Sequence, residues 1–386
     1  MRKLRSNFMP YRGGLVMVTG ILLVAGAILG LASTAAASSL LPTLPAGQGN
    51  EACLACHNQV GMTRPMPSGE TLVLTVDPQH YDASVHRDIL CTDCHTTITT
   101  FPHPELTAES LREITIEMYT SCQQCHSEQF RRTLDSVHQQ ALAGGNLNAA
   151  VCADCHNPHT QTAILDDEGN ILPEARLHIP QTCAHCHSAI YGQYAESVHG
   201  AALTAENNPD VPTCIDCHGV HDIEDPRTAA FRLSSPQICA ECHTDADIMD
   251  QYGISTDVLN TYVADFHGTT VTLFEQRSPD QATNKPVCYD CHGIHDITPT
   301  DDPVHGISIR DNLLTTCQRC HPDATANFPS SWMSHYIPSQ ENYPIVYYVN
   351  LFYKIFIPAV LGPMILYVLT DVARRMIERR KGAKHA

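Results

Sequence analysis

Two stretches of this sequence, "PTCIDCHGVHDI" at Pro212–Ile223 and "PVCYDCHGIHDI" at Pro286–Ile297, are identical at nine of their twelve positions. Each contains two cysteines three positions apart, a histidine directly after the second cysteine, and another histidine three positions later. The central pattern, C-x-x-C-H, occurs nine times in the 386 residues and uses all 18 cysteines. The chain is therefore organised around repeats of one short motif.

The nine motifs, numbered 1 to 9 in chain order, predict nine covalently bound haem c groups. Two cysteines at this spacing can each bond one vinyl group of a single porphyrin, and the next histidine can ligate its iron. Zinc arrays, disulfide frameworks and thioredoxin-like pairs also use C-x-x-C, but none of them requires a histidine at the next position. The cysteines are Cys53 and Cys56, Cys91 and Cys94, Cys122 and Cys125, Cys152 and Cys155, Cys183 and Cys186, Cys214 and Cys217, Cys239 and Cys242, Cys288 and Cys291, and Cys317 and Cys320. The motif histidines are His57, His95, His126, His156, His187, His218, His243, His292 and His321.

The composition leaves little material for a side-chain core. Aromatic residues make up 6% of the chain and tryptophan occurs once. Between the first and last motifs there are roughly 30 residues for each motif, which is too few for a separate domain around each porphyrin. We expect short α-helices and loops wrapped around the haems, which would form much of the interior, with little β-structure.

The first 37 residues have the order of a secretory signal. Basic residues come first, an apolar run follows from Leu15 to Ala32, and small residues end the segment. This order predicts a signal peptide over residues 1–37, while the length of the run also allows an uncleaved N-terminal anchor. Both interpretations place residues 38–342 outside the cytoplasm, as one exported nine-haem domain.

The other end predicts a transmembrane helix over residues 343–370. This segment has one charged residue, Lys354, and its aromatic residues gather near its start. Six basic residues follow within residues 371–386. An excess of Lys and Arg marks the cytoplasmic side of a membrane span, so this tail is expected in the cytoplasm. A helix bound to a partner or lying in the membrane interface is the alternative.

The exported body is strongly acidic. Between Ser38 and Tyr343 there are 12 Lys and Arg against 39 Asp and Glu, a formal charge of −27. This charge argues against binding of nucleic acid or of anionic membrane surfaces, and it favours basic partners or simple solubility.

Fourteen of the 23 histidines do not end a motif, and nine of these follow two patterns that predict second axial ligands. Five of them end similar short phrases: His86, His138, His199, His267 and His335. In three of these phrases, at His86, His138 and His199, the last three residues are Ser-Val-His. Three follow a motif histidine by three positions, and a fourth follows at a longer spacing; these are His159, His221, His295 and His103.

The two patterns together reveal four repeat units, at residues 86–126, 138–187, 199–243 and 267–321. Each unit has a phrase histidine, a motif, a near-following histidine and a second motif. A histidine three positions after a ligand is too constrained to reach the opposite face of the same porphyrin, so it is expected to ligate a neighbouring haem. We expect the stretches 127–144 and 188–204 each to form one helix that presents its histidine.

Other residues compete for these roles. Any single histidine of the nine could be a surface or hydrogen-bonded residue, and the spacing of His103 departs from the others. His80 is the main competitor for His103 or His86. Methionine is an alternative axial ligand, but no methionine phrase repeats, so we interpret the available ones as packing or surface residues: Met62, Met66, Met249 and Met333.

On these motifs, residues 53–335 resemble the multihaem c-type cytochromes of the cytochrome c3-like, doubled C-x-x-C-H class. The resemblance implies bis-histidine haems that pass single electrons through an exported domain on the outer side of the inner membrane. As partners of such an electron carrier we expect a quinol-oxidising or cytochrome b-type membrane subunit on one side, and an exported redox protein or terminal reductase on the other. The alternative is a multihaem reductase, of the nitrite, hydroxylamine or tetrathionate type, with one open haem. No motif histidine is replaced by lysine, so we expect an electron carrier rather than an enzyme.

Overall fold

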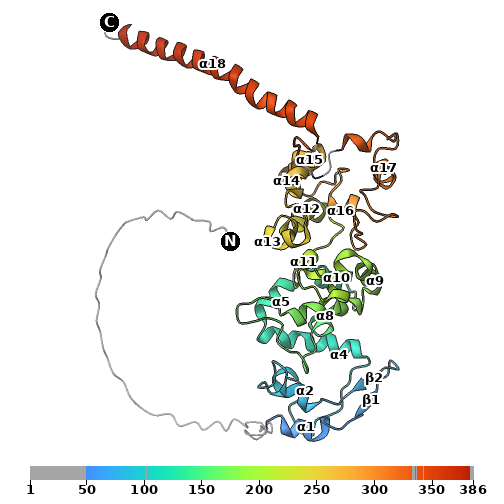
Figure 1. Cartoon of the computed structure of the whole chain (residues 1–386). Helices are drawn as coiled ribbons and strands as arrows, with labels where there is room; N and C mark the ends of the chain where they lie inside the picture. Colours follow the sequence, from blue (N-terminus) through green and yellow to red (C-terminus); the bar gives the residue numbers. More distant parts are fainter. Residues whose placement is uncertain (1–48, 101, 333–334, 336, 342, 383–386) are drawn as a thin grey trace, which may run out of the picture. The chain divides into compact units, whose positions relative to one another are not determined.

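The computed structural model describes residues 49–100, 102–332, 335, 337–341 and 343–382. The predicted signal peptide or N-terminal anchor lies outside the described residues, as does Met333. The described part is built mainly of short helices joined by long loops, with one long helix at its C-terminal end (Figure 1). The predicted fold class is confirmed to this extent.

The helices of the body are short, and several of them begin or end at motif residues. In the first half they are α1 (Glu51–His57), α2 (Pro78–Asp82), α3 (Cys91–Cys94), α4 (Leu111–Met118), the 3₁₀ helix η1 (Tyr119–Gln124), α5 (Ser127–Thr133), α6 (Val137–Ala143), α7 (Cys152–Cys155) and α8 (Pro173–Ala184). In the second half they are α9 (Ser188–Glu196), α10 (Val198–Glu206), α11 (Cys214–His218), α12 (Ala229–His243), α13 (Ala246–Met249), η2 (Asp250–Tyr252), α14 (Val258–Ala264), α15 (Phe266–Arg277), α16 (Cys288–His292), α17 (Arg310–Gln318) and η3 (Pro329–Ser331).

Regular β-structure in the described residues is one small hairpin. Strands β1 (Thr63–Pro65) and β2 (Thr71–Val73) pair antiparallel, with Thr63 opposite Val73 and Pro65 opposite Thr71. Gly69 has a φ of +87°, which a glycine adopts without steric cost, and it lies in the connection between the strands. The expectation of little β-structure is confirmed.

The even-numbered motifs begin their own helices. In α3, α7, α11 and α16 the first motif cysteine is the first helical residue, and an aspartate two positions later accepts a hydrogen bond from the backbone N–H of the residue before the helix. For example, Val287 N–H donates to Asp290 at 2.7 Å. The Asp in C-x-D-C-H therefore satisfies an N–H that the short helix leaves free.

The expectation of one continuous helix over 127–144 and over 188–204 is wrong. Each stretch forms two helices, α5 with α6 and α9 with α10, which meet at a serine in extended conformation. Ser136 accepts a hydrogen bond from the N–H of Gln139, and Ser197 accepts one from the N–H of Gly200. A serine that caps a new helix competes with continuation of the old one, which is the physical reason for the break.

Successive repeat units are joined by the same backbone hydrogen bond. The N–H of the valine in each Ser-Val-His phrase donates to a carbonyl just beyond the near-following histidine of the next unit. The bonds are Val85 to Gln161, Val137 to Ile223 and Val198 to Ile297, each at 2.8 Å. Each phrase is thereby held beside the loop of the following unit.

Arginines add a second link between helices and motifs. Arg176 donates to Asp216 at 2.8 Å and to the carbonyls of Pro209 and Val211. Arg112 makes the corresponding ion pair with Asp154, and Arg232 with Asp290, both at 2.8 Å. Each arginine thus ties the helix that leads into an odd-numbered motif to the start of the next even-numbered motif.

The apolar core of the described body is small. Its central cluster consists of Leu233, Val271 and Val287, with Phe274 and Tyr289 packed against it. Fourteen hydrophobic residues are buried, and they are spread from Met66 to Ala324. So few buried apolar side chains would contribute little to the stability of a chain of this length.

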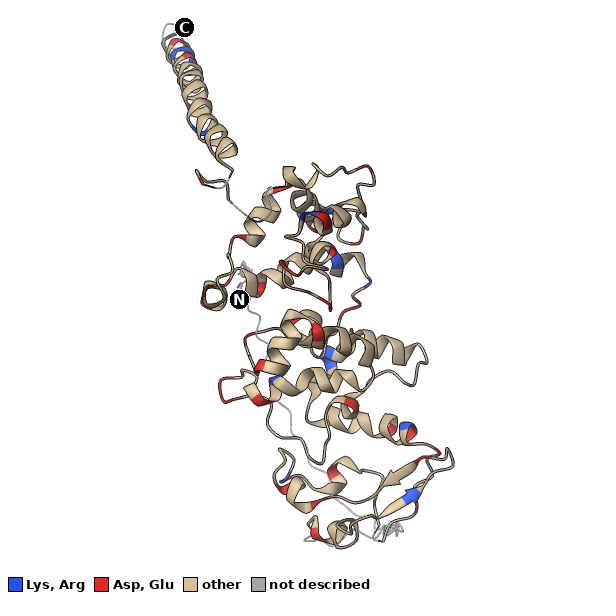
Figure 2. Cartoon of the chain, turned by 45° about the vertical axis from the view of Figure 1, so that its right-hand side comes forward, with Lys and Arg blue, Asp and Glu red and all other residues tan. Residues whose placement is uncertain are grey.

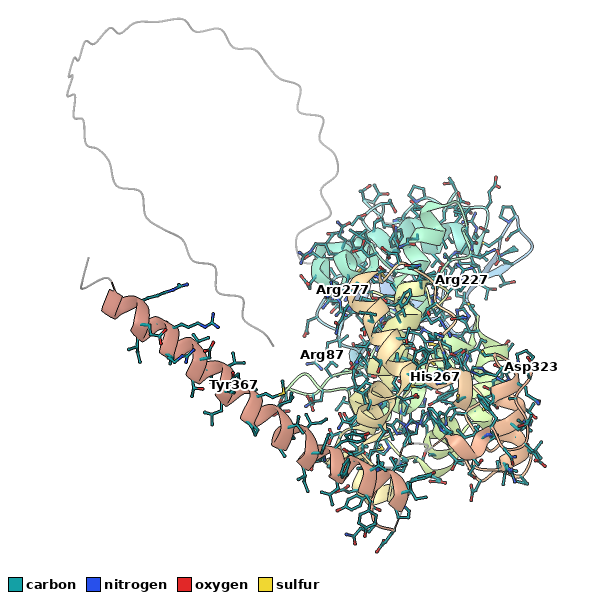
Figure 3. The ribbon with its side chains drawn as sticks, turned by 90° about the horizontal axis from the view of Figure 1, so that it is seen from above. Arg87, Arg227, His267, Arg277, Asp323 and Tyr367 are labelled. Atoms are coloured by element: carbon teal, nitrogen blue, oxygen red, sulfur yellow. The ribbon has the colours of Figure 1, made fainter. Side chains whose placement is uncertain are left out.

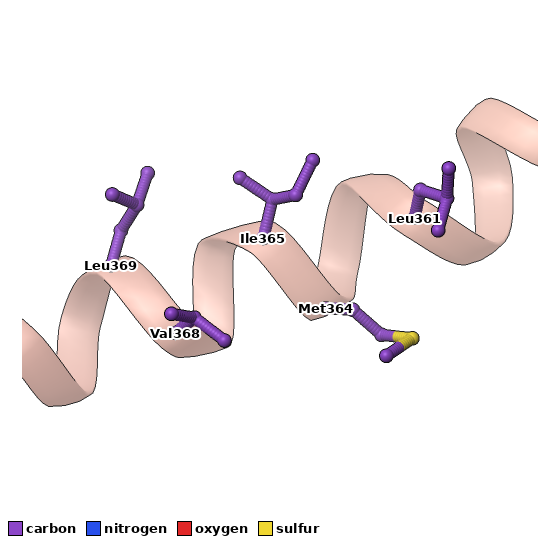
Figure 4. A pocket seen from close by; sticks show the side chains of 5 residues that line it. All are labelled: Leu361, Met364, Ile365, Val368 and Leu369. Carbon is purple, nitrogen blue, oxygen red and sulfur yellow. The ribbon is translucent and has the colours of Figure 1, made fainter.

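The last helix, α18 (Pro344–Gly382), differs from the rest. Among the described residues it is the one helix long and apolar enough to cross a membrane, with a mean hydropathy of 1.9 over its most apolar window. Its side chains, such as Tyr367, project from the helix on all sides (Figure 3). Leu361, Ile365 and Leu369 form one apolar row, with Met364 and Val368 beside it (Figure 4). The prediction of a C-terminal helix able to span a membrane is confirmed at this level.

Candidate functional site

The structure brings the 18 predicted histidine ligands together as nine pairs. Every motif histidine has one partner, every partner belongs to the two sequence patterns, and the ring centroids of each pair are 6.1–6.3 Å apart. The pairs are His57 with His103, His95 with His159, His126 with His86, His156 with His221, His187 with His138, His218 with His295, His243 with His199, His292 with His335, and His321 with His267.

This separation fits two imidazoles on opposite sides of one metal ion. A histidine nitrogen binds a metal at about 2.0–2.1 Å, and the ring centre lies about 1.1 Å behind that nitrogen, so the two centroids would be roughly 6.2–6.4 Å apart. Direct ring packing allows a much wider range, about 4.5–7 Å. Other aromatic contacts among the described residues vary more, from 5.1 Å for His321 and Phe328 to 6.3 Å for Phe266 and His267. Nine values within 0.2 Å therefore fit a common ligand better than chance packing.

The pairing follows the repeat units in a regular way. Each phrase histidine from His86 to His267 pairs with the second motif of its own unit, as His199 does with His243. Each near-following histidine instead pairs with an earlier motif, as His221 does with His156. His103 pairs with His57 of motif 1, and His335 pairs with His292 of motif 8. In every case the near-following histidine lies against a motif other than its own.

Glycines in C-H-G-x-H direct the chain away from the motif. Gly219 and Gly293 have φ values of +77° and +85° with ψ near 180°, a region that is essentially confined to glycine. A Cβ on Gly293 would lie 2.6 Å from the carboxylate of Asp296. The glycine is therefore required where the backbone turns between His292 and His295.

Several paired histidines have an oxygen atom beside the ring nitrogen Nδ1. The carbonyl oxygens of Leu74, Pro158 and Pro104 lie 2.7–3.0 Å from Nδ1 of His57, His86 and His103. For two others the partner is a side-chain oxygen, Gln161 Oε1 for His156 and Thr261 Oγ1 for His335. An Nδ1–H that donates to such an oxygen leaves Nε2 free as the metal-binding nitrogen.

Burial keeps members of the pairs uncharged. Desolvation is the main cause that lowers the pKa of His199 and of His292 to about 4, and the nearby imidazoles of His243 and His335 lower it further. A neutral imidazole is the form that binds a metal. At neutral pH these two side chains therefore already have the protonation state that a metal ligand needs.

Contacts between cysteines place successive motifs next to one another. The first cysteines of motifs 1 and 2, 3 and 4, 5 and 6, and 7 and 8 hydrogen-bond to each other: Cys53 with Cys91, Cys122 with Cys152, Cys183 with Cys214, and Cys239 with Cys288. The second cysteines of the even motifs lie near the cysteines of the following motif: Cys94 near Cys122, Cys155 near Cys183, Cys217 near Cys239, and Cys291 near Cys317. The motifs thus form a series in chain order from 1 to 9.

The competing residues lie outside the pairs. His80 is exposed and lies 3.2 Å from Asp77, away from any motif histidine. His178, His185 and His305 have no ring contact with another histidine among the described residues, and His385 is outside them. Met66 and Met249 are buried as packing residues.

No cluster of three or more His, Cys, Asp or Glu that could hold a metal ion occurs among the described residues. A zinc site needs four ligands, usually from the protein. A haem iron needs only two protein ligands, because the porphyrin supplies four nitrogens. Paired histidines beside C-x-x-C therefore fit a haem better than a bare ion.

The residues that support the paired histidines were not predicted from the sequence. Two of the three arginines that bind C-x-D-C aspartates carry a readable signal, because Arg176 and Arg232 each lie seven positions before the first cysteine of an odd motif. Arg310 has the same spacing but donates to the carbonyl of Ala326. Asp265, which lies beside His267, also escaped notice.

Comparisons with protein-family models, with curated proteins and with solved structures find no significant match for this chain.

Proposed function

We propose that this protein is a membrane-anchored multihaem cytochrome c with nine bis-histidine haems. It would pass electrons between a quinol-oxidising or cytochrome b-type membrane partner and an exported redox protein or terminal reductase. Haem iron supplies one-electron chemistry by changing between its ferric and ferrous states. The polypeptide would hold the groups, fix their ligands and exclude water from them.

The observation that carries the proposal is the set of nine histidine pairs with nearly equal separations. Each pair includes a histidine that directly follows a C-x-x-C, so the residues for thioether attachment are always beside the residues for axial ligation. The small apolar core supports the proposal as well, because porphyrins would supply the missing buried apolar surface.

The order of the motifs supports a route for electrons. Cysteines of adjacent motifs lie close enough to influence one another electrostatically from motif 1 to motif 9. Groups attached to these cysteines would therefore lie near their neighbours in the same order. A continuous series of this kind suits transfer from one end of the body to the other.

The complete pairing favours electron transfer over the multihaem reductase considered above. An iron with two histidine ligands has no vacant position for a substrate. Since all nine motif histidines have a partner, no described motif is left with an open side.

The helix α18 supports anchoring in a membrane. Its basic residues gather at its C-terminal end, whereas acidic residues are scattered over the rest of the described chain (Figure 2). By the bias of Lys and Arg toward the cytoplasm, the C-terminal tail would be cytoplasmic and the haem domain periplasmic or extracellular.

The test is to purify the full-length protein and to measure its haem content by pyridine haemochrome and its iron content. The oxidised protein is then studied by low-temperature EPR with and without cyanide, nitrite or hydroxylamine. We expect nine haems per chain, all low-spin and unchanged by these ligands. No haem, or zinc in its place, would overturn the proposal. A high-spin signal that one of the ligands changes would favour the reductase.

A further inference from the structure

The fourth repeat unit differs from the other three in its histidine phrase, and one of the differences lies two positions before the histidine. In the first three phrases the residue two positions before the histidine is a serine, whereas the fourth unit has Asp265 before His267. The three serines are Ser84, Ser136 and Ser197. The role of Asp265 can therefore be compared with that of the serine at the same position in each of the other three units.

All three serines are buried. Ser136 and Ser197 cap the helices α6 and α10, and Ser84 begins a turn. The three serines are 1–3% exposed, and each hydroxyl accepts a hydrogen bond from a backbone N–H in the turn that follows. Aspartate is as good a helix cap as serine, so the substitution by itself would allow the same role.

Asp265 does not take that role. It occupies the N-cap position of α15 in extended conformation, but its side chain accepts no capping hydrogen bond. Its Oδ2 atom lies 3.5 Å from Nδ1 of His267 and is buried without a hydrogen-bond partner in the described residues. The carboxylate thus faces the ligand histidine instead of the helix.

No cation neutralises this carboxylate within the described ion pairs. The ammonium of Lys285 lies over the ring of the adjacent Phe266, at 5.0 Å, and no ion pair between Lys285 and Asp265 is formed. At the other paired histidines with an identified Nδ1 contact, the oxygen belongs to a neutral group. The His267–His321 pair is therefore the one with a carboxylate within 4.0 Å among the described residues.

We propose that Asp265 is a positioning residue that makes His267 the most electron-donating ligand of the set, so that the haem of motif 9 has a lower reduction potential than it would have with serine there. The inference rests on the proposed function. A buried negative charge 3.5 Å from Nδ1 of a ligating imidazole raises the basicity of that imidazole, and a more basic ligand stabilises the ferric state. The haem of motif 9, at the C-terminal end of the series, would therefore be reduced at a lower potential than its two histidine ligands would give it without Asp265.

The test compares the full-length holoprotein with Asp265→Ser, which restores the residue of the other three units, and with Asp265→Asn, which keeps the shape without the charge. Asp77→Ser is the matched control, because Asp77 lies 3.2 Å from His80, a histidine outside the pairs. Redox titrations are followed in the visible spectrum. A His267→Ala variant identifies which wave belongs to the haem of motif 9, because only that haem should change from low-spin to high-spin.

In both Asp265 variants we expect that wave, about one ninth of the absorbance change, to move to higher potential by more than any other wave. The wave of motif 8 should move less, because the charge of Asp265 also acts on His335, the partner of His292. The titration of Asp77→Ser should superimpose on that of the unmodified protein. Nine haems with an unmoved ninth wave, or with another wave moved further, would overturn this inference and leave the proposed function intact. A protein without haem would overturn both. If Asp265→Ser fails to fold, Asp265→Asn decides alone.

Discussion

The ring of His295 lies 6.1 Å from that of His218, which belongs to the preceding repeat unit, although His295 follows the motif histidine His292 by only three positions. The turn at Gly293 separates the two neighbours in sequence. Two residues beyond His295, the carbonyl of Ile297 accepts the N–H of Val198 from that same preceding unit. One short loop therefore completes a site in one unit and fastens the next unit to it.

Substitution of Gly293 by alanine should disturb the site of motif 6 more than that of motif 8. The backbone of Gly293 is in a region that costs other residues about 1–3 kcal/mol, and the new Cβ would meet the Asp296 carboxylate. Relief of this strain would move His295 away from His218. EPR should reveal loss of one low-spin haem. Gly192→Ala is the control, because Gly192 lies in α9 with no atom within 4 Å of the added Cβ, and it should leave the spectrum unchanged. Equal effects of both variants would contradict this explanation.

Replacement of Arg232 by methionine should lower the stability of the second half of the body. The guanidinium donates to Asp290, to the Tyr289 hydroxyl and to the carbonyl of Lys285. Because the pair is partly buried, with side chains 26% and 34% exposed, its loss should cost about 1–3 kcal/mol. Far-UV circular dichroism during urea unfolding measures the change. Arg227→Met removes a pair with Asp225 in which the arginine side chain is 83% exposed, and it should have a much smaller effect. A tolerated Arg232→Met would mean that the motif helix forms without this link.

Removal of the His199 side chain should open one coordination position and no more. His199 is the partner of His243 and is well buried. In His199→Ala about one ninth of the iron should become high-spin and bind cyanide, because the other pairs remain complete. Added imidazole should restore the low-spin state. His178→Ala, on the exposed side of α8, should remain fully low-spin. Cyanide binding to the unmodified protein at the same level would refute the assignment of His199.

Tyr194 should make stability sensitive to alkaline pH. Burial is the largest cause that raises its pKa above 10, and its hydroxyl donates to the carbonyl of Pro212 at 2.8 Å. A raised pKa in the folded state means that this contribution is complete below pH 10 and declines as the pH rises further, by up to about 1.4 kcal/mol per pH unit. Tyr194→Phe should therefore lose about 1 kcal/mol at pH 7, and the difference from the unmodified protein should shrink above pH 10.

Urea unfolding at pH 7, 9 and 10.5 measures this dependence. Tyr191→Phe, on the same helix, is the control, since no hydrogen bond of its hydroxyl is found in the described residues and its removal should not alter the pH profile. A constant difference between Tyr194→Phe and the unmodified protein at all three pH values would contradict the role assigned to Tyr194.

The local sequence pattern was sufficient to predict the candidate ligands and the type of fold. C-x-x-C-H fixes cysteine and histidine within five residues, and the phrases around His86, His138 and His199 repeat almost letter for letter, so the 18 histidines could be named without a structure. The length and hydropathy of residues 343–370 likewise predicted the long C-terminal helix, because a membrane span is a property of one continuous segment.

The partner of each histidine, the breaks at Ser136 and Ser197, and the carboxylate beside His267 were decided by tertiary structure. A helix cap and a continuing helix have similar local energies, so the hydrogen bond from Val198 to Ile297 in another unit contributes to the choice. The pairing of His295 with His218 depends on contacts between units that sequence spacing does not encode. The sequence by itself therefore determined which residues are candidates to bind haem, and only the tertiary structure decided which residues meet, because those contacts join segments far apart in the chain.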